Sequence, residues 1–537
     1  MIRRISLIVF AALLAGWLHW PSLHNGFVTW DDLEYLRPVK DHGGLSPALV
    51  RWAFTAIRPF YYHPLTWLSH ALDFSLWGFW PAGHHAASVV LHAVNTGLVA
   101  MLTWRMLGFG NGSPNERAVV TALVAGVFGA HPLTVESVAW LAERKTLLCA
   151  TFCLASVAAY LRRAWWTCQA LAVAALLSKP MAVPLPVVLL VLDDFPLQRA
   201  RTAPWSKLVA EKLPLLGLSL VTGLLTIVSQ REGGAVTPLL RFDLVERYVV
   251  ATRNLLFYLW KMIWPAWLSP YYPLEGAIPI ADAEFLLPAV VVPLLIAGVW
   301  WARRWTRLPS SGWWTYALLV LPVSGLMQAG AQGAADRFAY LPMVPVLIAL
   351  AVGGLALARR LGNLGRLALV VLLGCYAAFL GFQTRAQIPV WRDDETLWRS
   401  AHRYFPNSVL INWKLALALA GQEKYAAALE WAERAGHLSG GEPRILGTLG
   451  WVYLRNGRSR EAAQALEDAA ARSEATARVR YHLACAYAQL GQPESALENL
   501  RGALDREPSY ATSAATDPDL AALRADPRFG QLVGQEF

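Results

Sequence analysis

Long apolar stretches recur between positions 1 and 385 of the chain and set the limits of the fold. A helix needs about 20 apolar residues to cross the hydrocarbon core of a bilayer. On this measure the sequence predicts about eleven membrane spans, near residues 5–23, 84–104, 118–138, 145–161, 165–179, 181–195, 213–229, 282–302, 312–328, 338–358 and 366–383. Because 56% of the residues are hydrophobic and 16% are charged, the composition also argues against a soluble protein.

Basic residues gather in alternate loops between these stretches, as at Arg3-Arg4, Arg162-Arg163 and Arg303-Arg304. Cytoplasmic loops of membrane proteins carry such an excess of Lys and Arg. Eleven crossings then place segments 24–83 and 230–281 outside, together with the C-terminal domain. We therefore expect a multi-pass protein of the plasma (inner) membrane. The same rule accounts for the net charge of +10, so nucleic acid is not an expected partner.

The C-terminal part is soluble in composition and repeats at a fixed interval. Leu415, Leu449 and Leu483 recur at one constant interval, and Tyr453 and Tyr487 are separated by the same interval. The interval matches tetratricopeptide (TPR) repeats, whose period is about 34 residues and whose surfaces bind extended peptides or partner proteins. The sequence therefore predicts an all-α protein with three parts: a polytopic membrane helix bundle over 1–385, a linker over 386–406 and a TPR α-solenoid with a C-terminal cap over 407–537.

Two adjacent carboxylates, Asp31 and Asp32, follow the first apolar stretch. Ionisable side chains beside a membrane are costly unless they are paired or functional. One of them can act as a general base toward an acceptor hydroxyl, and the pair can also hold a divalent metal ion. The alternative is that Asp32 caps a short helix over 33–36.

A second polar group lies where the third span ends and the fourth begins, and comprises His131, Glu136, Glu143, Arg144 and Lys145. Cations at this boundary can hold a phosphate, and Arg can bind two of its oxygens. The alternative is that Glu143 pairs with Arg144 while the stem of Lys145 extends to the interface.

Three further charged residues stand in apolar surroundings. Asp336 and Arg337 precede the tenth span, and Arg337 is a second candidate for a phosphate, or else half of a structural ion pair. Lys179 lies at Ser178-Lys179-Pro180, where the fifth and sixth spans break and are expected to form a hairpin. It can bind an anion or reach the membrane interface.

Histidines punctuate the first outer loop and the second span, at His63, His84, His85 and His92. They lack HExxH or comparable zinc spacing, and the five cysteines form no CxxC motif. Histidines on packed helices are ordinarily hydrogen-bonded residues of the core. His84, at the outer mouth of the span, and His63 are the candidates for the site.

Taken in order, several of these motifs resemble those of a known family. The set comprises Trp30-Asp31-Asp32, Tyr62-His63-Pro64-Leu65-Thr66, His84 to Asn95, His131-Pro132 to Arg144-Lys145, Leu177 to Val183, Trp264-Pro265 to Tyr272-Pro273, Asp336 to Pro342, and then the TPR repeats. The chain resembles bacterial relatives of the transmembrane and TPR-containing O-mannosyltransferases, in the GT-C superfamily of glycosyltransferases. One departure is His63, where the family carries Arg before Pro-Leu.

The resemblance implies a GT-C-type enzyme that takes a sugar from a polyprenyl-phosphate donor in the membrane. Its acceptor would be a hydroxyl on a protein or peptide presented by the TPR repeats, at the extracytoplasmic face. It further implies that Asp31 or Asp32 is the catalytic carboxylate, and that Arg144, Lys145 and Arg337 face the donor phosphate. Two other hypotheses are a non-catalytic TPR scaffold for envelope assembly and a transporter, although matching broken-helix halves are not visible.

Overall fold

The computed structural model describes residues 2–56, 62–110, 113–232, 242–326, 332–473 and 475–534. It divides into two compact units, Met1–Thr396 and Leu397–Phe537. The predicted outer segments 24–83 and 230–281 and the predicted span 312–328 lie partly outside the described residues.

The first unit is a bundle of long apolar helices with a short strand pair, so the predicted helical class is confirmed. Within the described residues, seven helices are long and apolar enough to cross a membrane. They are built on α1 (Ile2–His19), α5 (Pro81–Met106), α8 (Arg144–Leu161), α12 (Leu213–Glu232), α14 (Ala283–Ala302), α16 (Met343–Arg360) and α17 (Asn363–Gln387). An eighth is a bent pair, α6 (Pro114–Ala130) with η3 (Pro132–Thr134) and α7 (Val135–Ala139), which turns by 51°.

The remaining three predicted spans coincide with shorter helices, so the number eleven stays a prediction. These helices are α9 (Trp165–Ser178), α10 (Leu185–Asp194) and α15 (Leu308–Val320). They have 14, 10 and 13 residues, whereas about 20 are needed to cross the hydrocarbon core.

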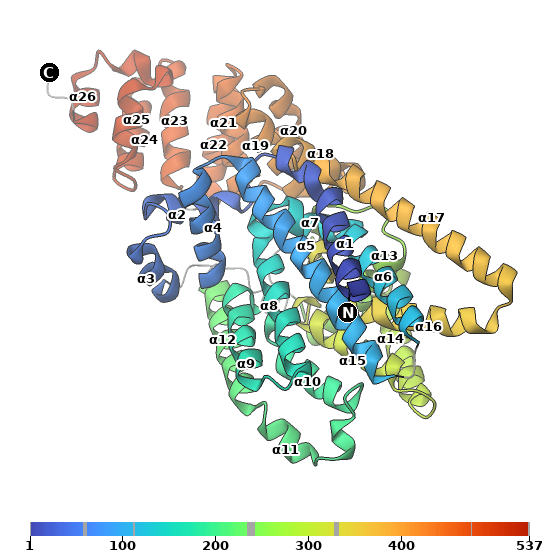
Figure 1. Ribbon diagram of the computed structural model, residues 1–537. Helices are drawn as coiled ribbons and strands as arrows, with labels where there is room; N and C mark the ends of the chain where they lie inside the picture. Colours follow the sequence, from blue (N-terminus) through green and yellow to red (C-terminus); the bar gives the residue numbers. More distant parts are fainter. Residues whose placement is uncertain are drawn as a thin grey trace. The chain divides into compact units, whose positions relative to one another are not determined.

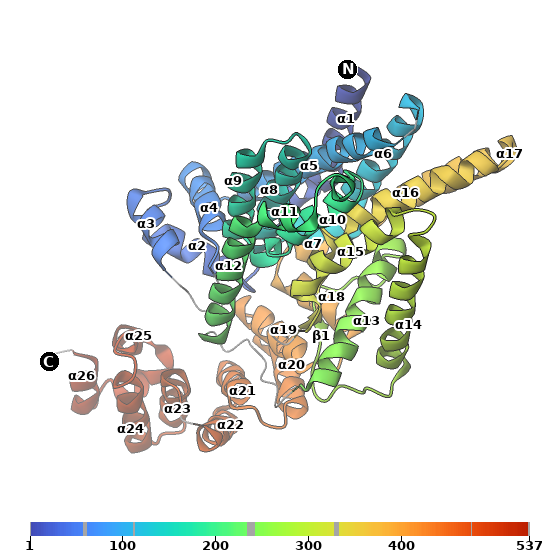
Figure 2. The same ribbon diagram turned by 90° about the horizontal axis from the view of Figure 1, so that it is seen from below.

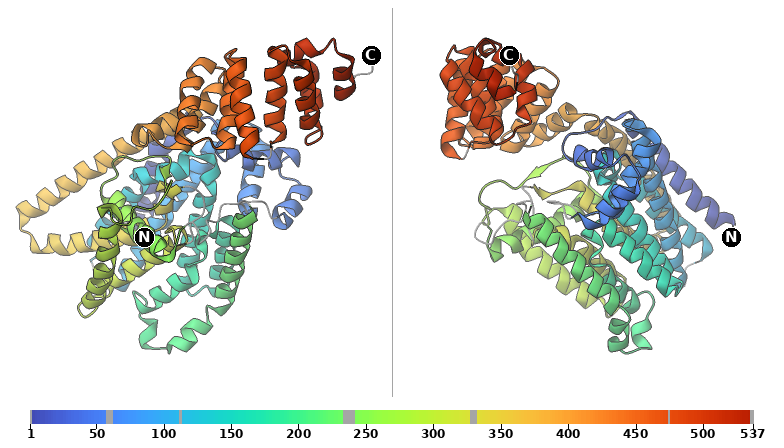
Figure 3. Two further views of the ribbon diagram at one scale, coloured as in Figure 1. Left: turned by 180° about the vertical axis from the view of Figure 1, so that it is seen from behind. Right: turned by 90° about the vertical axis from the view of Figure 1, so that its left-hand side faces the viewer.

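The bundle is arranged around α5. Helix α1 packs on α5 and α6, and α8 packs on α5 and α9, as Figure 1 shows in blue to teal. Helices α13 (Leu244–Ile263), α14 and α15 form a second group (Figure 2), in which α14 packs on both neighbours. Helix α17 extends away from the rest of this unit (Figure 3) and is mostly exposed.

Both predicted outer segments are partly folded. The first contains α2 (Asp32–Asp41), α3 (Pro47–Thr55) and α4 (Pro64–Trp77), and α4 packs on α2, α3 and α5. The second contains α13 and a short antiparallel pair of strands, β1 (Tyr272–Pro273) with β2 (Gln332–Ala334). A capping box of Asp243 and Glu246 starts α13 by satisfying its first backbone N–H groups.

Two prolines shape the end of the bundle where α1 ends and α5 and α8 begin. His131 ends α6 in an extended conformation, and Pro132 then starts a new helical turn. Lys179 is likewise extended between α9 and η5 (Pro180–Ala182), because a residue before proline is disfavoured in the helical region. The expected break at Ser178-Lys179-Pro180 is therefore present.

The second unit is a TPR solenoid, as predicted. Its first helices, α19 (Val409–Gly421), α21 (Pro443–Arg455) and α23 (Ala477–Gln489), begin at a constant interval of one repeat. Their partners begin at the same interval and are α20 (Tyr425–Leu438), α22 (Ser459–Arg472) and α24 (Pro493–Leu504). A cap of α25 (Tyr510–Thr516), η10 (Pro518–Leu523) and α26 (Pro527–Val533) follows.

Contacts in the solenoid repeat with the sequence. Tyr453 donates a hydrogen bond to Glu433, and one repeat later Tyr487 donates one to Glu467. A Cβ at Gly450 would overlap the side chain of Leu466, so the paired helices approach closely there. The period of the sequence thus reflects one helix pair stacked on the next.

The predicted linker 386–406 is largely helical. Helix α17 continues to Gln387, η9 covers Ile388–Trp391, and α18 covers Asp394–Tyr404. Trp391 and Trp398 are buried. The acidic sequence at 393–395 is thus flanked by two buried indoles.

Candidate active site

The carboxylate of Glu143 lies at the centre of a buried ion cluster. Its oxygens are 3.1 Å from Lys145 Nζ, 2.9 Å from Lys179 Nζ and 3.2 Å from Arg337 Nε. Glu143 precedes α8, Lys179 follows α9 and Arg337 precedes α16. The fold therefore brings three of the four predicted phosphate ligands, far apart in sequence, to one carboxylate.

A second carboxylate, Glu136, fixes the position of Arg337. It accepts hydrogen bonds from the backbone N–H of Arg337, at 2.8 Å, and from its guanidinium. Both side chains are buried. Because the two carboxylates Glu136 and Glu143 flank the guanidinium, its charge stays in one place, and its pKa lies above the ordinary value despite burial.

Asp31 joins this cluster through Lys145. Its Oδ2 lies 3.8 Å from Lys145 Nζ, and its side chain is 20% exposed, against 1% for Glu143. Asp31 is thus the most accessible of the carboxylates that contact these cations.

Asp32 has a different environment from its neighbour. It is buried, and its two oxygens accept hydrogen bonds from the backbone N–H groups of Val28 and Ala142, both at 2.9 Å. Burial raises its pKa to about 7. The helix-cap alternative is wrong, because Asp32 is the first residue of α2 and its side chain accepts its hydrogen bonds from outside that helix. These hydrogen bonds instead fasten the first outer segment to the turn before α8.

Aromatic rings enclose the cluster. Trp140 stacks on Trp30, with ring centroids 4.9 Å apart, and on Trp391, at 5.2 Å. Lys145 Nζ lies 5.6 Å from the Trp140 ring and 5.0 Å from the ring of Tyr35. These rings shield the cations from water and also attract them.

Arg144, the fourth predicted phosphate ligand, lies apart from the other three. Its guanidinium donates to the Asp73 carboxylate and, at 2.6 Å, to the backbone oxygen of His84. The side chain is fully buried. In this arrangement Arg144 joins α8 to α4 and α5, and Asp73 supplies its counter-charge.

The predicted histidines make mainly backbone or aromatic contacts. His63 Nδ1 is 2.9 Å from the Tyr35 hydroxyl, His84 Nε2 is 2.8 Å from the Gly78 oxygen, and His131 Nε2 is 3.1 Å from the Met262 oxygen. His63 reaches the cluster indirectly, because Tyr35 lies over Lys145. His131 sits in the bend after α6, outside the cluster.

Asp336 is next to Arg337 in sequence but bonds to another element. It accepts a hydrogen bond of 2.9 Å from the Tyr272 hydroxyl on β1. Burial raises the pKa of Asp336 to about 8, and the nearby Glu136 carboxylate acts in the same direction. Asp336 therefore holds the short strand pair against the cluster.

Sequence reasoning did not select Tyr35, Asp73 or Trp140. Asp73 carried a usable signal, since it is a lone acid in the apolar helix α4. Trp140 lies between two predicted site residues, Glu136 and Glu143. Tyr35 gave no signal of its own, because its role depends on a contact with Lys145, which lies far from it in the sequence.

The adjacent carboxylates do not fit a divalent cation. Mg²⁺ and Ca²⁺ need about six oxygen ligands, but the Asp32 oxygens accept two backbone N–H groups and Asp31 faces the Lys145 ammonium. Within the described residues, the group whose ligand atoms are close enough for an ion is Cys485, Asp517 and Asp519, in the second unit.

The two units define a class: an integral membrane protein with a buried cluster of acids and bases at one end of its helix bundle and a TPR solenoid after it. Comparison with known proteins agrees with this class. The tetratricopeptide repeat family model matches residues 448–511.

The chain is also similar to the human Protein O-mannosyl-transferase TMTC4, with 24% identity over 424 residues. The match covers 69% of this chain and 57% of that protein, so the chain spans little more than half of the relative's length. The predicted resemblance to the TPR-containing O-mannosyltransferases is thereby confirmed.

Among solved structures, the chain is similar to the crystal structure of ArnT from Cupriavidus metallidurans bound to undecaprenyl phosphate. The TM-score is 0.33 and the identity 16%, over 86% of this chain and 79% of that one.

Proposed function

We propose that the chain is a membrane glycosyltransferase. It moves a sugar from a polyprenyl-phosphate-linked donor to a hydroxyl acceptor on protein, at the extracytoplasmic face of the plasma (inner) membrane. The observation that carries the proposal is the cluster in which Lys145, Lys179 and Arg337 surround Glu143 and the partly exposed Asp31 contacts Lys145.

The reaction needs a base and a stabilised leaving group. The acceptor oxygen attacks the anomeric carbon while its proton passes to the Asp31 carboxylate. The bond between that carbon and the phosphate oxygen breaks, and its electron pair leaves with the polyprenyl phosphate. Attack opposite the leaving group inverts the anomeric centre, so the product linkage has the configuration opposite to the donor's.

The three cations meet the second need. Charge grows on the phosphate as the sugar leaves, and cations fixed in advance stabilise that charge without reorganising. Arg337 suits this role best, because Glu136 and Glu143 fix its guanidinium from two sides. Arg144 lies outside the group around Glu143 and links α8 to Asp73 on α4 and to the His84 backbone oxygen on α5, so we assign it a structural part.

The two aspartates have different roles in this reaction. Asp31 serves as the base, since its side chain remains partly exposed. Asp32 positions it by tying the first outer segment to Ala142. The TPR unit supplies a surface of the kind that binds extended peptides, and would bring the protein acceptor to the enzyme.

A TPR scaffold without catalysis is the alternative. It would need the spans and the repeats but no ion cluster. Buried ion pairs are poor sources of stability, because desolvation of the charges offsets most of their attraction. A cluster of buried charges beside the accessible Asp31 carboxylate therefore favours an enzyme over a scaffold.

The test is sugar transfer by the purified full-length protein, with a radiolabelled polyprenyl-phosphate sugar as donor. Asp31→Asn should reduce transfer by about 100-fold or more, as loss of a general base does. Asp41→Asn, at the exposed end of the same helix α2, is the matched control and should transfer at the wild-type rate. Wild-type transfer by a well-folded Asp31→Asn variant would exclude Asp31 as the base.

A further inference from the structure

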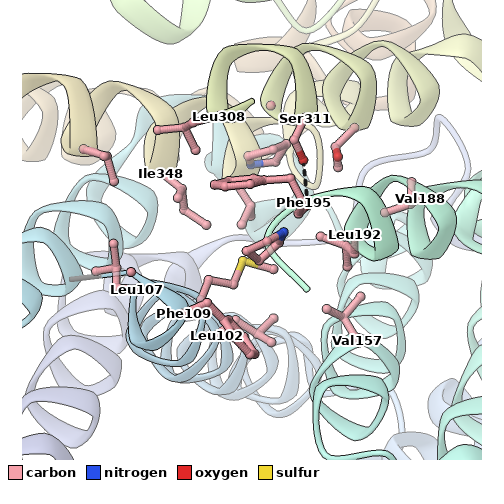
Figure 4. Close-up of a pocket in the computed structure, with 18 of the residues that line it drawn as sticks. Leu102, Leu107, Phe109, Val157, Val188, Leu192, Phe195, Leu308, Ser311 and Ile348 are labelled. Carbon is pink, nitrogen blue, oxygen red and sulfur yellow. Dashed lines mark hydrogen bonds between the residues drawn. The ribbon is translucent and has the colours of Figure 1, made fainter. Parts of the chain in front are cut away.

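An apolar cavity lies in the first unit, at a different place from the ion cluster. It has a volume of about 390 Å³ and is lined by side chains from α5, α6, α8, α10, α15 and α16. Figure 4 shows Leu102, Val157, Val188 and Ile348 pointing into it. The hydroxyl of Ser311, on its wall, donates to the Phe195 backbone oxygen and so offers the cavity no unpaired donor.

The charged side chains of the lining gather at one end. Glu116, Arg117 and Arg359 are the three charged residues among those that line the cavity. Arg359 pairs with Glu116 at 2.7 Å, and Arg117 donates one bond to the Trp104 backbone oxygen. The Nε of Arg117 is buried without a hydrogen-bond partner among the described residues.

This end has a surplus of positive charge. Arg3 donates to Asn115, which places it beside the start of α6. Arg4 and Arg162 act electrostatically on Arg105, next to the lining residue Met106. The Nε atoms of Arg4 and Arg105 are also buried and lack a partner in the described part of the chain. We call Arg4, Arg105, Arg117 and Arg162 the arginine rim; Arg117 lines the cavity itself, whereas Arg4 and Arg162 are placed near this end by their relation to Arg105.

The length of the cavity suits one lipid chain. Lining residues on α16 run from Val344 to Arg359, which at 1.5 Å per residue is about 22 Å along the helix. The hydrocarbon core of a bilayer is about 30 Å thick, so a chain from one leaflet spans about 15 Å. A straight hydrocarbon chain therefore fits between the rim and the middle of the bundle.

We propose that this cavity binds one acyl chain of an anionic glycerophospholipid, whose phosphate is held by the arginine rim. The apolar lining takes the chain, and the unpaired guanidinium N–H groups and the excess charge select an anionic head group over a zwitterionic one. The site is distinct from the donor site around Glu143, and the inference does not depend on the proposed function.

The experiment uses the full chain in phosphatidylcholine nanodiscs and a phosphatidylglycerol probe with a photoreactive diazirine in its acyl chain. Labelled peptides are located by mass spectrometry. Labelling should fall on α8, α10 and α16. Ile348→Trp fills the cavity and should lower the labelling at least fivefold. Val188→Phe fills less of the cavity and replaces the first variant if that one misfolds. Leu350→Trp, on the exposed side of the same helix, should leave labelling unchanged.

The rim is tested by competition with unlabelled phosphatidylglycerol. Arg117→Gln should weaken the competitor about fivefold, the factor expected for one basic residue near an anionic lipid. Arg304→Gln is the control, because Arg304 stacks on Trp301 and Trp305 away from the cavity.

Three results would overturn the inference. The first is equal labelling of Ile348→Trp, Val188→Phe and Leu350→Trp. The second is equal labelling by a phosphatidylcholine probe. The third is displacement of the probe by a polyprenyl phosphate at lower concentration than by phosphatidylglycerol, which would assign the cavity to the donor's tail.

Discussion

The indole rings of Trp140 and Trp391 stack with their centroids 5.2 Å apart and their planes at 17°. Trp140 is the ring on which Lys145 and Arg337 also rest. Two hydrogen bonds reinforce the contact: Gly26 N–H to the Arg392 oxygen at 2.8 Å, and Thr29 N–H to the Asp394 carboxylate at 2.8 Å. The chain that follows the last span is thus fastened to the segment that carries Asp31.

Trp391→Ala should therefore reduce transfer without unfolding the bundle. Replacing a buried Trp with Ala lowers the free energy of unfolding by about 3–5 kcal/mol. The substitution also removes the ring that covers one face of Trp140. We expect kcat to fall at least tenfold, because the Asp31 segment loses its anchor, while the KM for donor changes less. Steady-state kinetics with the polyprenyl-phosphate donor measure both.

Trp391→Phe should recover most of the activity, because a phenyl ring still stacks on Trp140. Trp305→Ala removes an indole that is 66% exposed and serves as the control for general loss of tryptophan. A fall in kcat of equal size in the Trp305 variant would contradict the anchoring role of Trp391.

Glu143→Gln should destabilise the protein. The substitution leaves three buried cations facing a neutral amide, and breaking a buried ion pair costs about 3–5 kcal/mol. Thermal unfolding in detergent should show a clearly lower midpoint, with activity lost in the fraction that stays folded. Glu34→Gln, at an exposed position in α2, should unfold like the wild type.

Asp336 should make stability fall as pH rises. The folded state keeps the Asp336 proton up to about pH 8, whereas the carboxyl of an unfolded chain loses it near 3.8. Between these values the folded state binds more protons, so the free energy of unfolding falls by up to about 1.4 kcal/mol per pH unit.

Asp336→Asn removes this titration and retains an oxygen for the Tyr272 hydroxyl. The difference between its unfolding midpoint and that of the wild type should therefore shift in favour of the variant as pH rises from 5 to 8. Tyr272→Phe removes the hydrogen bond but keeps the carboxyl, and should still show the pH dependence. A parallel decline of wild type and Asp336→Asn would assign the effect to other groups.

Arg337→Lys and Arg144→Lys should separate donor binding from structure. Lysine cannot bridge two carboxylates as a guanidinium does, so Arg337→Lys should lower kcat/KM for the donor at least tenfold. Arg144→Lys loses its bonds to Asp73 and His84, so it should mainly lower the unfolding midpoint. The measurement is kcat/KM for the donor in the folded fraction of each variant. An equal loss of kcat/KM in both variants would show that Arg144 also contacts the donor phosphate.

Much of the architecture follows from local patterns in the sequence. The apolar stretches give the spans because each must be long enough for a bilayer, and the period of the C-terminal part gives the solenoid because each repeat packs on the next. Pro132 and Pro180 mark the turns at the site end of the bundle. For α9, α10 and α15 the length of the helix does not determine whether it spans the membrane, because these helices have only 10 to 14 residues.

The sequence by itself determined that charged residues stand at the ends of apolar stretches or between them, at Asp31, Arg144, Lys145, Lys179 and Arg337. Only the tertiary structure decided which of them meet. Consecutive residues on a helix point about 100° apart, so Arg144 turns to Asp73 while Lys145 turns to Glu143 and Asp31. Such a choice depends on which helix lies on each side of α8, and no local pattern carries that information.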